Sequence, residues 1–142
     1  MHKVTKIVSF CYGHRLLDYD GKCRYLHGHN GLLEIDVESD SLDELGMVVD
    51  FGKISDIVKK WVDSTLDHRM ILSARDPIVD SLMKAGEPLY LMEENPTAEN
   101  IAKHVFTVTR ERGLRVIAVR LWETSSSYAT YSEHKTDVEG SR

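Results

Sequence analysis

The chain has 142 residues, of which 42% are hydrophobic and 29% charged, and this length and composition are typical of one globular domain spanning residues 1–142. Its formal net charge is −5 without a basic block, which argues against nucleic acid as a partner because phosphate contacts need clustered Lys and Arg. No apolar run is long enough to cross a bilayer and the first residues lack a signal-peptide pattern, so we expect a cytoplasmic protein with no membrane partner.

Two segments near the N-terminus alternate apolar and polar residues with the period of two that is typical of β-strands. They cover residues 4–14 and 27–38, and the second is apolar on one face and largely acidic on the other. Such a pattern predicts a half-buried strand, antiparallel to the first. Residues 15–26 between them contain Asp and Gly and predict a loop.

The apolar period then changes to that of helices. Asp50 is a suitable N-cap for a helix whose apolar stripe runs from Phe51 to Leu66. A second helix should begin at Thr97, whose hydroxyl can cap it, and should end at Gly113.

Two further strands are expected at residues 115–123 and 127–133. Residues 69–94 are hard to assign, although their LMKAG stretch suits a short helix and their EPLYLM stretch a short strand. The order β-β-α-α-β-β predicts an α+β fold in which two helices cover one face of an antiparallel sheet. Because such a sheet has exposed edges that favour pairing between subunits, we expect a homo-oligomer.

Three histidines occupy positions that suit a metal centre. His27 and His29 stand two residues apart in a predicted strand, so their side chains share a face with Cα atoms about 6.5–7 Å apart. His14 ends the neighbouring strand and can supply a third imidazole. Three neutral imidazoles with an open fourth position are typical of catalytic zinc. Taken alone, the pattern also allows three ordinary surface or core histidines.

Six short motifs occur along the chain in a characteristic order. They are FCYGH (10–14), CRYLHGHN (23–30), GMVVDF (46–51), LDH (66–68), NPTAEN (95–100) and WET (122–124). Together they resemble the 6-pyruvoyltetrahydropterin synthase / 6-carboxytetrahydropterin synthase family, over about residues 5–133. The resemblance implies the tunnelling fold, whose subunits join edge to edge into a trimeric barrel, with two trimers stacking into a hexamer. One departure is Cys11-Tyr12-Gly13, where the family often has Ser-Ala-Ala.

The resemblance also implies roles for individual residues. These are His14, His27 and His29 as ligands of one Zn²⁺ per subunit, Cys23, Asp67 and His68 as the catalytic group, Glu123 as the carboxylate that anchors the pterin, and Thr97 and Glu99 as members of a motif that lines the same pocket. Active sites in the family lie between subunits, so these groups need not come from one chain.

The chemistry of the catalytic residues agrees with these roles. Lys22 and Arg24 flank Cys23, and neighbouring cations favour the thiolate, which can act as a base. A carboxylate at Asp67 can orient the imidazole of His68 and raise its basicity. The alternatives are that Cys23 is a small buried side chain, and that Asp67 and His68 merely end the first helix.

Four side chains suit the recognition of a pterin triphosphate. Glu123 can accept hydrogen bonds from the ring N–H and the exocyclic amine of a pterin, which lie side by side. Arg15, Lys22 and Arg24 are candidates for contacts with the triphosphate, although all three also suit a solvated surface.

The substrate implied by the resemblance is 7,8-dihydroneopterin triphosphate, and two products compete. Three residues separate Cys23 from His27, and Asp50-Phe51 is present, as in bacterial enzymes that form 6-carboxytetrahydropterin and acetaldehyde for queuosine and 7-deazapurine biosynthesis. The alternative is 6-pyruvoyltetrahydropterin, the product of the tetrahydrobiopterin-type pathway. A zinc-stabilised binding module or a non-catalytic pterin-binding paralogue are the non-enzymatic alternatives.

Overall fold

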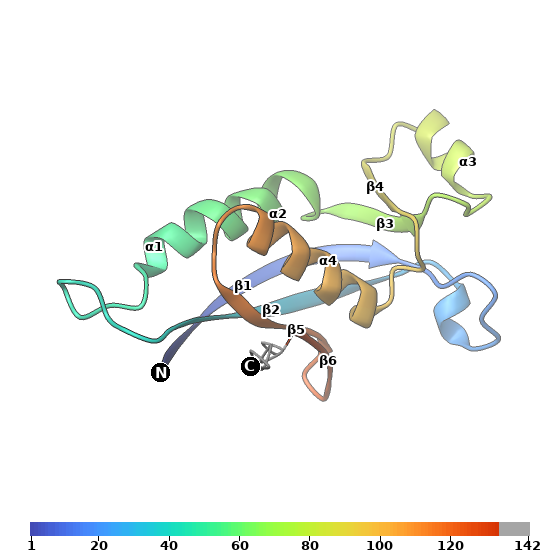
Figure 1. Ribbon diagram of the computed structural model, residues 1–142. Helices are drawn as coiled ribbons and strands as arrows, with labels where there is room; N and C mark the ends of the chain where they lie inside the picture. The colour runs from blue at the N-terminus through green and yellow to red at the C-terminus, as the bar shows by residue number, and fades with distance from the viewer. Residues whose placement is uncertain (134–142) are drawn as a thin grey trace, which may run out of the picture.

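The computed structural model describes residues 1–133, so the last nine residues of the expected domain lie outside the described part (Figure 1). The strands are β1 (His2–His14), β2 (His27–Ser39), β3 (Arg69–Ser73), β4 (Leu89–Met92), β5 (Val116–Thr124) and β6 (Ser127–Ser132). The helices are α1 (Phe51–Ile54), α2 (Lys60–Thr65), α3 (Val79–Lys84) and α4 (Ala98–Glu111). None of these helices combines the length and the apolar composition that a bilayer span requires.

The strands of residues 1–133 form one sheet in the order β4-β3-β1-β2-β5-β6. The long β1–β2 pair is antiparallel, as predicted, and so are β2–β5 and β5–β6. The expectation of a wholly antiparallel sheet is wrong, because β3 runs parallel to both β1 and β4. Parallel neighbours need a crossover connection, and the segment that carries α3 supplies it between β3 and β4. The α+β class itself is confirmed.

The core lies between one face of the sheet and two helical segments, one running from α1 to α2 and the other α4 (Figure 1). Alternate residues of β1 and β2 point into it, among them Phe10, Leu33 and Ile35. From the helices, Val62 and Phe106 are almost fully buried against them. The prediction that the helices cover one face of the sheet is therefore confirmed.

The predicted helix ends agree with the structure. The Asp50 carboxylate accepts a 2.7 Å hydrogen bond from the backbone N–H of Gly52, at the start of α1. The Thr97 hydroxyl accepts from Asn100 N–H at 3.1 Å, and Gly113, with φ +95°, follows the end of α4. The first predicted helix is regular only in part, because a π-helical turn, Ser55–Lys59, joins α1 to α2.

The loop after β1 is tied down by two side chains that are distant in sequence. The amide of Asn95 pairs with the backbone of Leu17, accepting from its N–H at 2.9 Å and donating to its C=O at 3.0 Å. The Arg15 guanidinium forms a two-pronged ion pair with the buried carboxylate of Asp76. These contacts set the course of the chain between His14 and β2.

The sheet face opposite the helices carries a buried carboxylate. Asp36, 1% exposed, accepts hydrogen bonds from Thr5 at 2.6 Å, Arg120 at 3.0 Å and Lys3 at 3.3 Å. Burial acts to raise the pKa of Asp36, but these hydrogen bonds and the charge of Arg120 outweigh burial, so the pKa lies below its usual value. The ionised form of Asp36 therefore stabilises the fold at neutral pH.

Replacing Arg120 with Met should lower the free energy of unfolding at pH 7 by about 2 kcal/mol, because the buried carboxylate of Asp36 loses a charged hydrogen-bond partner. The pKa of Asp36 is depressed in the folded state, so this stabilisation is present above the usual carboxyl pKa and is lost as pH falls through the lowered value. The gap between wild type and variant should therefore close in acid. Unfolding by guanidinium chloride at fixed protein concentration measures this difference in the free energy of unfolding, and Arg112→Met, at an exposed arginine, is the control. Equal losses of stability in both variants would contradict the expectation.

Candidate functional site

Three imidazoles converge where β1 and β2 meet. In the β1–β2 register His14 lies directly opposite His27, and His29 follows two residues later on the same face. The ring centroids lie 4.5 Å apart for His14 and His27 and 5.0 Å apart for the other two pairs. The Nε2 atoms of His14 and His29 are 3.1 Å apart. The structure thus brings together the three histidines that the sequence singles out.

Backbone carbonyls orient two of these rings. Nδ1 of His14 lies 2.7 Å from the carbonyl oxygen of Pro96, and Nδ1 of His27 lies 2.7 Å from that of Tyr25. A carbonyl only accepts, so each Nδ1 carries the proton and each Nε2 presents a lone pair. Nε2 of His27 is buried and has no hydrogen-bond partner within the described residues. A metal ion would give this lone pair a partner, and three imidazoles are a donor set that suits such an ion.

The surroundings of His14 and His29 lower the pKa of both imidazoles. Burial lowers the pKa of His14 to about 4; the Pro96 carbonyl opposes this shift, whereas His27 and His29 add to it. Burial also lowers the pKa of His29, against the opposing charge of Glu123. Neutral imidazole is the form that binds metal, so the site is ready for an ion at neutral pH.

Glu123, near the end of β5, lies beside the imidazoles. Its carboxylate oxygens are 3.8 Å from Nε2 of His14 and 4.0 Å from Nε2 of His29. Donor atoms on a tetrahedral zinc with bonds near 2.1 Å are about 3.4 Å apart. The carboxylate is therefore close enough to the imidazoles to contact a molecule bound at the cluster.

Tyr12 is a site residue that the sequence reasoning missed. Its ring packs against His14 and His29, with centroids 5.3 and 5.6 Å away, and its hydroxyl is buried beside Glu123. Burial and the charge of Glu123 raise the pKa of Tyr12 well above its usual range, so the hydroxyl stays protonated. The departure from the family pattern at this position was the available signal.

Asp67 and His68 form a hydrogen-bonded pair between α2 and β3. Oδ2 of Asp67 lies 2.9 Å from Nδ1 of His68, so the predicted pairing is present in the structure. Burial acts to raise the pKa of Asp67, but hydrogen bonds from the Cys11 backbone and from His68 outweigh it, and the pKa is lowered. The His68 side chain is 78% exposed, so this pair is open to a second molecule.

The pair lies beside Cys11 rather than Cys23. Asp67 Oδ1 accepts from the backbone N–H of Cys11 at 2.9 Å, and the backbone N–H of His68 donates to the Cys11 carbonyl at 2.7 Å. Cys23 sits in a half-buried 3₁₀ turn, Lys22–Arg24, and its thiol makes no hydrogen bond within the described residues. One chain therefore does not join Cys23 to the Asp67–His68 pair.

Of the remaining predicted residues, some lie near the histidines and others are exposed or already paired. Thr97 caps α4, and its neighbour Pro96 supplies the carbonyl that orients His14, whereas Glu99 is exposed in the first turn of α4. Among the triphosphate candidates, Arg15 is already paired with Asp76. Lys22 and Arg24 are exposed, and the Arg24 guanidinium lies over the Tyr25 ring at 4.8 Å.

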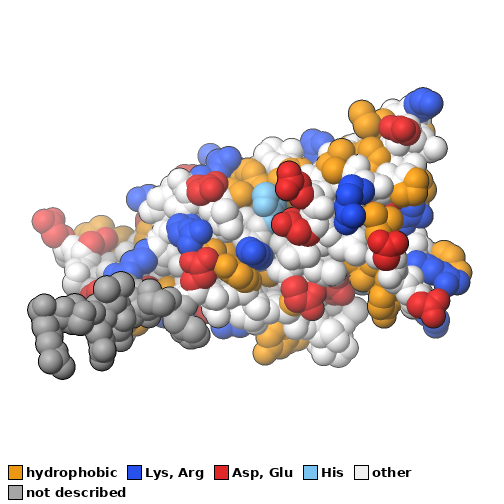
Figure 2. All heavy atoms as spheres, turned by 45° about the vertical axis from the view of Figure 1, so that its right-hand side comes forward, with side chains coloured by type: hydrophobic (Ala, Val, Ile, Leu, Met, Phe, Trp, Pro, Cys, Tyr) orange, Lys and Arg blue, Asp and Glu red, His pale blue; other side chains and the backbone are white. Residues whose placement is uncertain are grey.

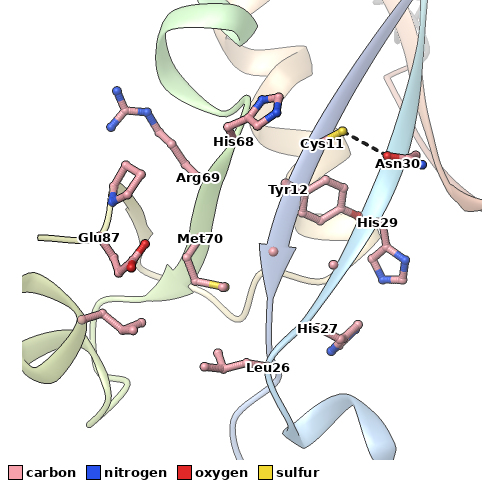
Figure 3. Close-up of a pocket in the computed structure, with 14 residues that line it drawn as sticks. Cys11, Tyr12, Leu26, His27, His29, Asn30, His68, Arg69, Met70 and Glu87 are labelled. Atoms are coloured by element: carbon pink, nitrogen blue, oxygen red, sulfur yellow. Dashed lines mark hydrogen bonds between the residues drawn. The ribbon is translucent and has the colours of Figure 1, made fainter. Parts of the chain in front are cut away.

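A cavity of about 590 Å³ opens between the end of β1 and the α3–β4 segment (Figure 3). Its wall includes Cys11, Asn30, His68, Met70 and Leu82. Elsewhere on the surface, acidic and basic side chains are interspersed over the face that Figure 2 shows. The cavity is large enough for a bicyclic ligand and is bordered by His68 and by His27 and His29 of the three-histidine cluster.

Comparisons with known proteins give a consistent result. The profile of the 6-pyruvoyl tetrahydropterin synthase family matches residues 3–134. The 6-carboxy-5,6,7,8-tetrahydropterin synthase of Rickettsia conorii is 44% identical over 107 residues, which cover 74% of this chain and 78% of that protein. The enzyme of the same name from Haemophilus influenzae is 33% identical over 141 residues, covering 94% of this chain and all (100%) of that protein.

Solved structures share the fold. An uncharacterized protein from Wolinella succinogenes superposes with a TM-score of 0.84 at 26% identity, covering 94% of this chain and 98% of that one. The 6-pyruvoyl tetrahydropterin synthase of Caenorhabditis elegans superposes with a TM-score of 0.70 at 24% identity, covering 94% and 96%. These likenesses confirm the expected tunnelling fold.

The three-histidine cluster should bind one zinc ion per chain, and His14→Ala should weaken that binding by more than about 100-fold, beyond what loss of an outer hydrogen-bond partner costs. Binding should also weaken as pH falls toward about 4, where His14 takes up a proton. Competition with a chromogenic chelator measures the affinity, and exposed His2→Ala is the control. Unchanged affinity in His14→Ala would show that the metal binds elsewhere.

Proposed function

Because the chain belongs to the 6-pyruvoyl tetrahydropterin synthase family, we propose that it is a zinc-dependent 6-carboxy-5,6,7,8-tetrahydropterin synthase. This lyase would convert 7,8-dihydroneopterin triphosphate to 6-carboxytetrahydropterin, acetaldehyde and triphosphate, on the route to queuosine and other 7-deazapurines. The observation that carries the proposal is the convergence of three imidazoles with Glu123 beside them. The names of the most similar relatives support the carboxy-type product.

His14, His27 and His29 would hold the zinc ion in this proposal. A bound zinc ion acts as a Lewis acid that polarises substrate oxygen atoms and stabilises developing negative charge. The carbonyls of Pro96 and Tyr25 keep two of the rings in the orientation that this binding needs. The protein thereby supplies a centre that changes little in shape when it binds the ion.

Glu123 would orient the pterin ring. Its carboxylate is 27% exposed and lies next to the imidazoles, so a ligand that donates two hydrogen bonds to it is held within reach of the metal. The buried hydroxyl of Tyr12 borders the same space and restricts its shape. Binding energy from the ring would therefore be used to position the substrate side chain.

Proton transfer would fall to Cys23 and the Asp67–His68 pair. Asp67 accepts from Nδ1 of His68, which leaves Nε2 of that ring free to exchange a proton with substrate. Because one chain does not join this pair to Cys23, we propose that the pair of one subunit completes the site of its neighbour. Among residues 1–133, the outer edges of β4 and β6 have no neighbouring strand, which supports assembly edge to edge into a trimer or a dimer of trimers.

Incubation of the zinc-loaded protein with 7,8-dihydroneopterin triphosphate should yield 6-carboxytetrahydropterin and acetaldehyde, identified by mass spectrometry. A 6-pyruvoyl product would replace this proposal with the alternative lyase activity. Unchanged substrate at full zinc occupancy would favour a non-catalytic pterin-binding protein.

Two variants separate catalysis from binding in the same assay. Cys23→Ser and His68→Gln should each lower kcat by about 100-fold or more while substrate binding changes little, because each removes a proton-transfer group. Glu111→Gln, at an exposed residue in the last turn of α4, is the control outside the candidate site. Parallel losses of turnover and affinity in His68→Gln would contradict its proposed role.

A further inference from the structure

A second group of metal-type donors lies outside the three-histidine centre. Cys11, Asp67 and His68 each offer one ligand atom, and the thiol sulfur, a carboxylate oxygen and an imidazole nitrogen all lie within 4.8 Å of one another. We propose that these residues form a second zinc site, whose occupation takes Asp67 and His68 out of proton transfer. This inhibitory consequence rests on the proposed function, whereas the binding itself does not.

The spacing of the donors suits zinc after a small adjustment. Zn–S bonds near 2.3 Å and Zn–N and Zn–O bonds near 2.1 Å place tetrahedral donors about 3.4–3.6 Å apart. The donor atoms lie no more than 4.8 Å apart, so the widest pair must close by at most about 1.4 Å, whereas Oδ2 of Asp67 and Nδ1 of His68, 2.9 Å apart, must separate slightly. The His68 ring can make this movement, because its side chain is 78% exposed.

The backbone of β1 holds the other two donors in place. The Cys11 N–H donates to Oδ1 of Asp67 at 2.9 Å, and the Cys11 carbonyl accepts from the N–H of His68 at 2.7 Å. These bonds leave Oδ2 of Asp67 directed at Nδ1 of His68, 2.9 Å away. A zinc ion would take the place of the proton that these two atoms share, and the thiol would lose its own proton on binding.

Asn30 adds a fourth polar group to the site. The Cys11 thiol donates to Oδ1 of Asn30 at 3.0 Å across the β1–β2 pair (Figure 3). The same amide oxygen can either complete the coordination of an ion or orient the sulfur toward it. The cavity of about 590 Å³ borders Cys11, Asn30 and His68 and gives the ion a route to the site.

The second site is separate from the three-histidine centre. Cys11 and Tyr12 are consecutive in β1, so their side chains leave the sheet on opposite faces, and Tyr12 packs with His14 and His29. Figure 3 shows His68 near Cys11, away from His27 and His29. The donor sets also differ, because a thiolate favours zinc and other soft ions over Mg²⁺ and Ca²⁺. Metal binding at the two sites can therefore be measured by separate spectroscopic signals.

Cobalt substitution distinguishes the sites by their ligands. Titration of metal-free protein with Co²⁺ should fill two sites per chain, and one of them should show the near-ultraviolet charge-transfer band of a thiolate–cobalt bond. Cys11→Ser should lose this band and keep one cobalt ion per chain, whereas the matched control Cys23→Ser should keep both. Absence of the band from wild type, its persistence in Cys11→Ser, or its loss in Cys23→Ser would each overturn the proposal.

A second variant guards against loss of folding. His68→Gln, at an exposed side chain, should weaken the thiolate-linked cobalt by at least tenfold and leave the visible bands of the three-histidine cobalt unchanged, which also reports an intact fold. Unchanged affinity in His68→Gln would contradict the assigned ligand set.

Activity supplies the regulatory test. Zinc beyond one equivalent should suppress turnover in wild type but not in Cys11→Ser, each compared with its own rate at one equivalent. Suppression of both proteins alike would refute inhibition through this site. If the protein turns over no pterin at all, the proposed function fails, and the cobalt spectra still decide whether the second site exists.

Discussion

The antiparallel register between β1 and β2 is the constraint on which the candidate site depends. It places His14 opposite His27 and brings His29 to the same face. A slip of one residue would turn His27 and His29 to the other face of the sheet, because side chains alternate with a period of two. The apolar residues that alternate along both strands oppose such a slip, since it would expose Leu33 and Ile35. The burial of the core therefore also sets the geometry of the metal centre.

Contacts from outside the β1–β2 pair orient the histidine side chains and lower the pKa of His14. The Pro96 carbonyl, just before α4, and the Tyr25 carbonyl, just before β2, each orient a ring by accepting from Nδ1. Burial and mutual repulsion lower the pKa of His14, so the charge-free form that binds metal dominates at neutral pH. Asn95 links these regions by pairing with the loop that follows β1. The fold therefore controls both the orientation and the protonation of the histidine side chains.

Much of this arrangement could be predicted from sequence, because it depends on local periodicity. The two long strands, the caps at Asp50 and Thr97, and the shared face of the histidines follow from spacing alone. β3 could not be predicted, because it is a short apolar run without alternation and is held by pairing with β1 and β4. Contacts between residues distant in sequence could not be predicted either. Nothing in the spacing of Cys11 and Asp67 indicates that they are hydrogen-bonded. The assignment of Cys23 to the Asp67–His68 pair stays a prediction for the assembled protein.

Zinc-edge X-ray absorption of protein loaded with one equivalent of zinc tests the open three-histidine centre most directly. The geometry predicts three imidazole nitrogens at about 2.0–2.1 Å and one further oxygen that is unchanged in Glu123→Gln. A sphere with fewer than three imidazoles, or one whose oxygen disappears in Glu123→Gln, would contradict an open position and with it the proposed chemistry.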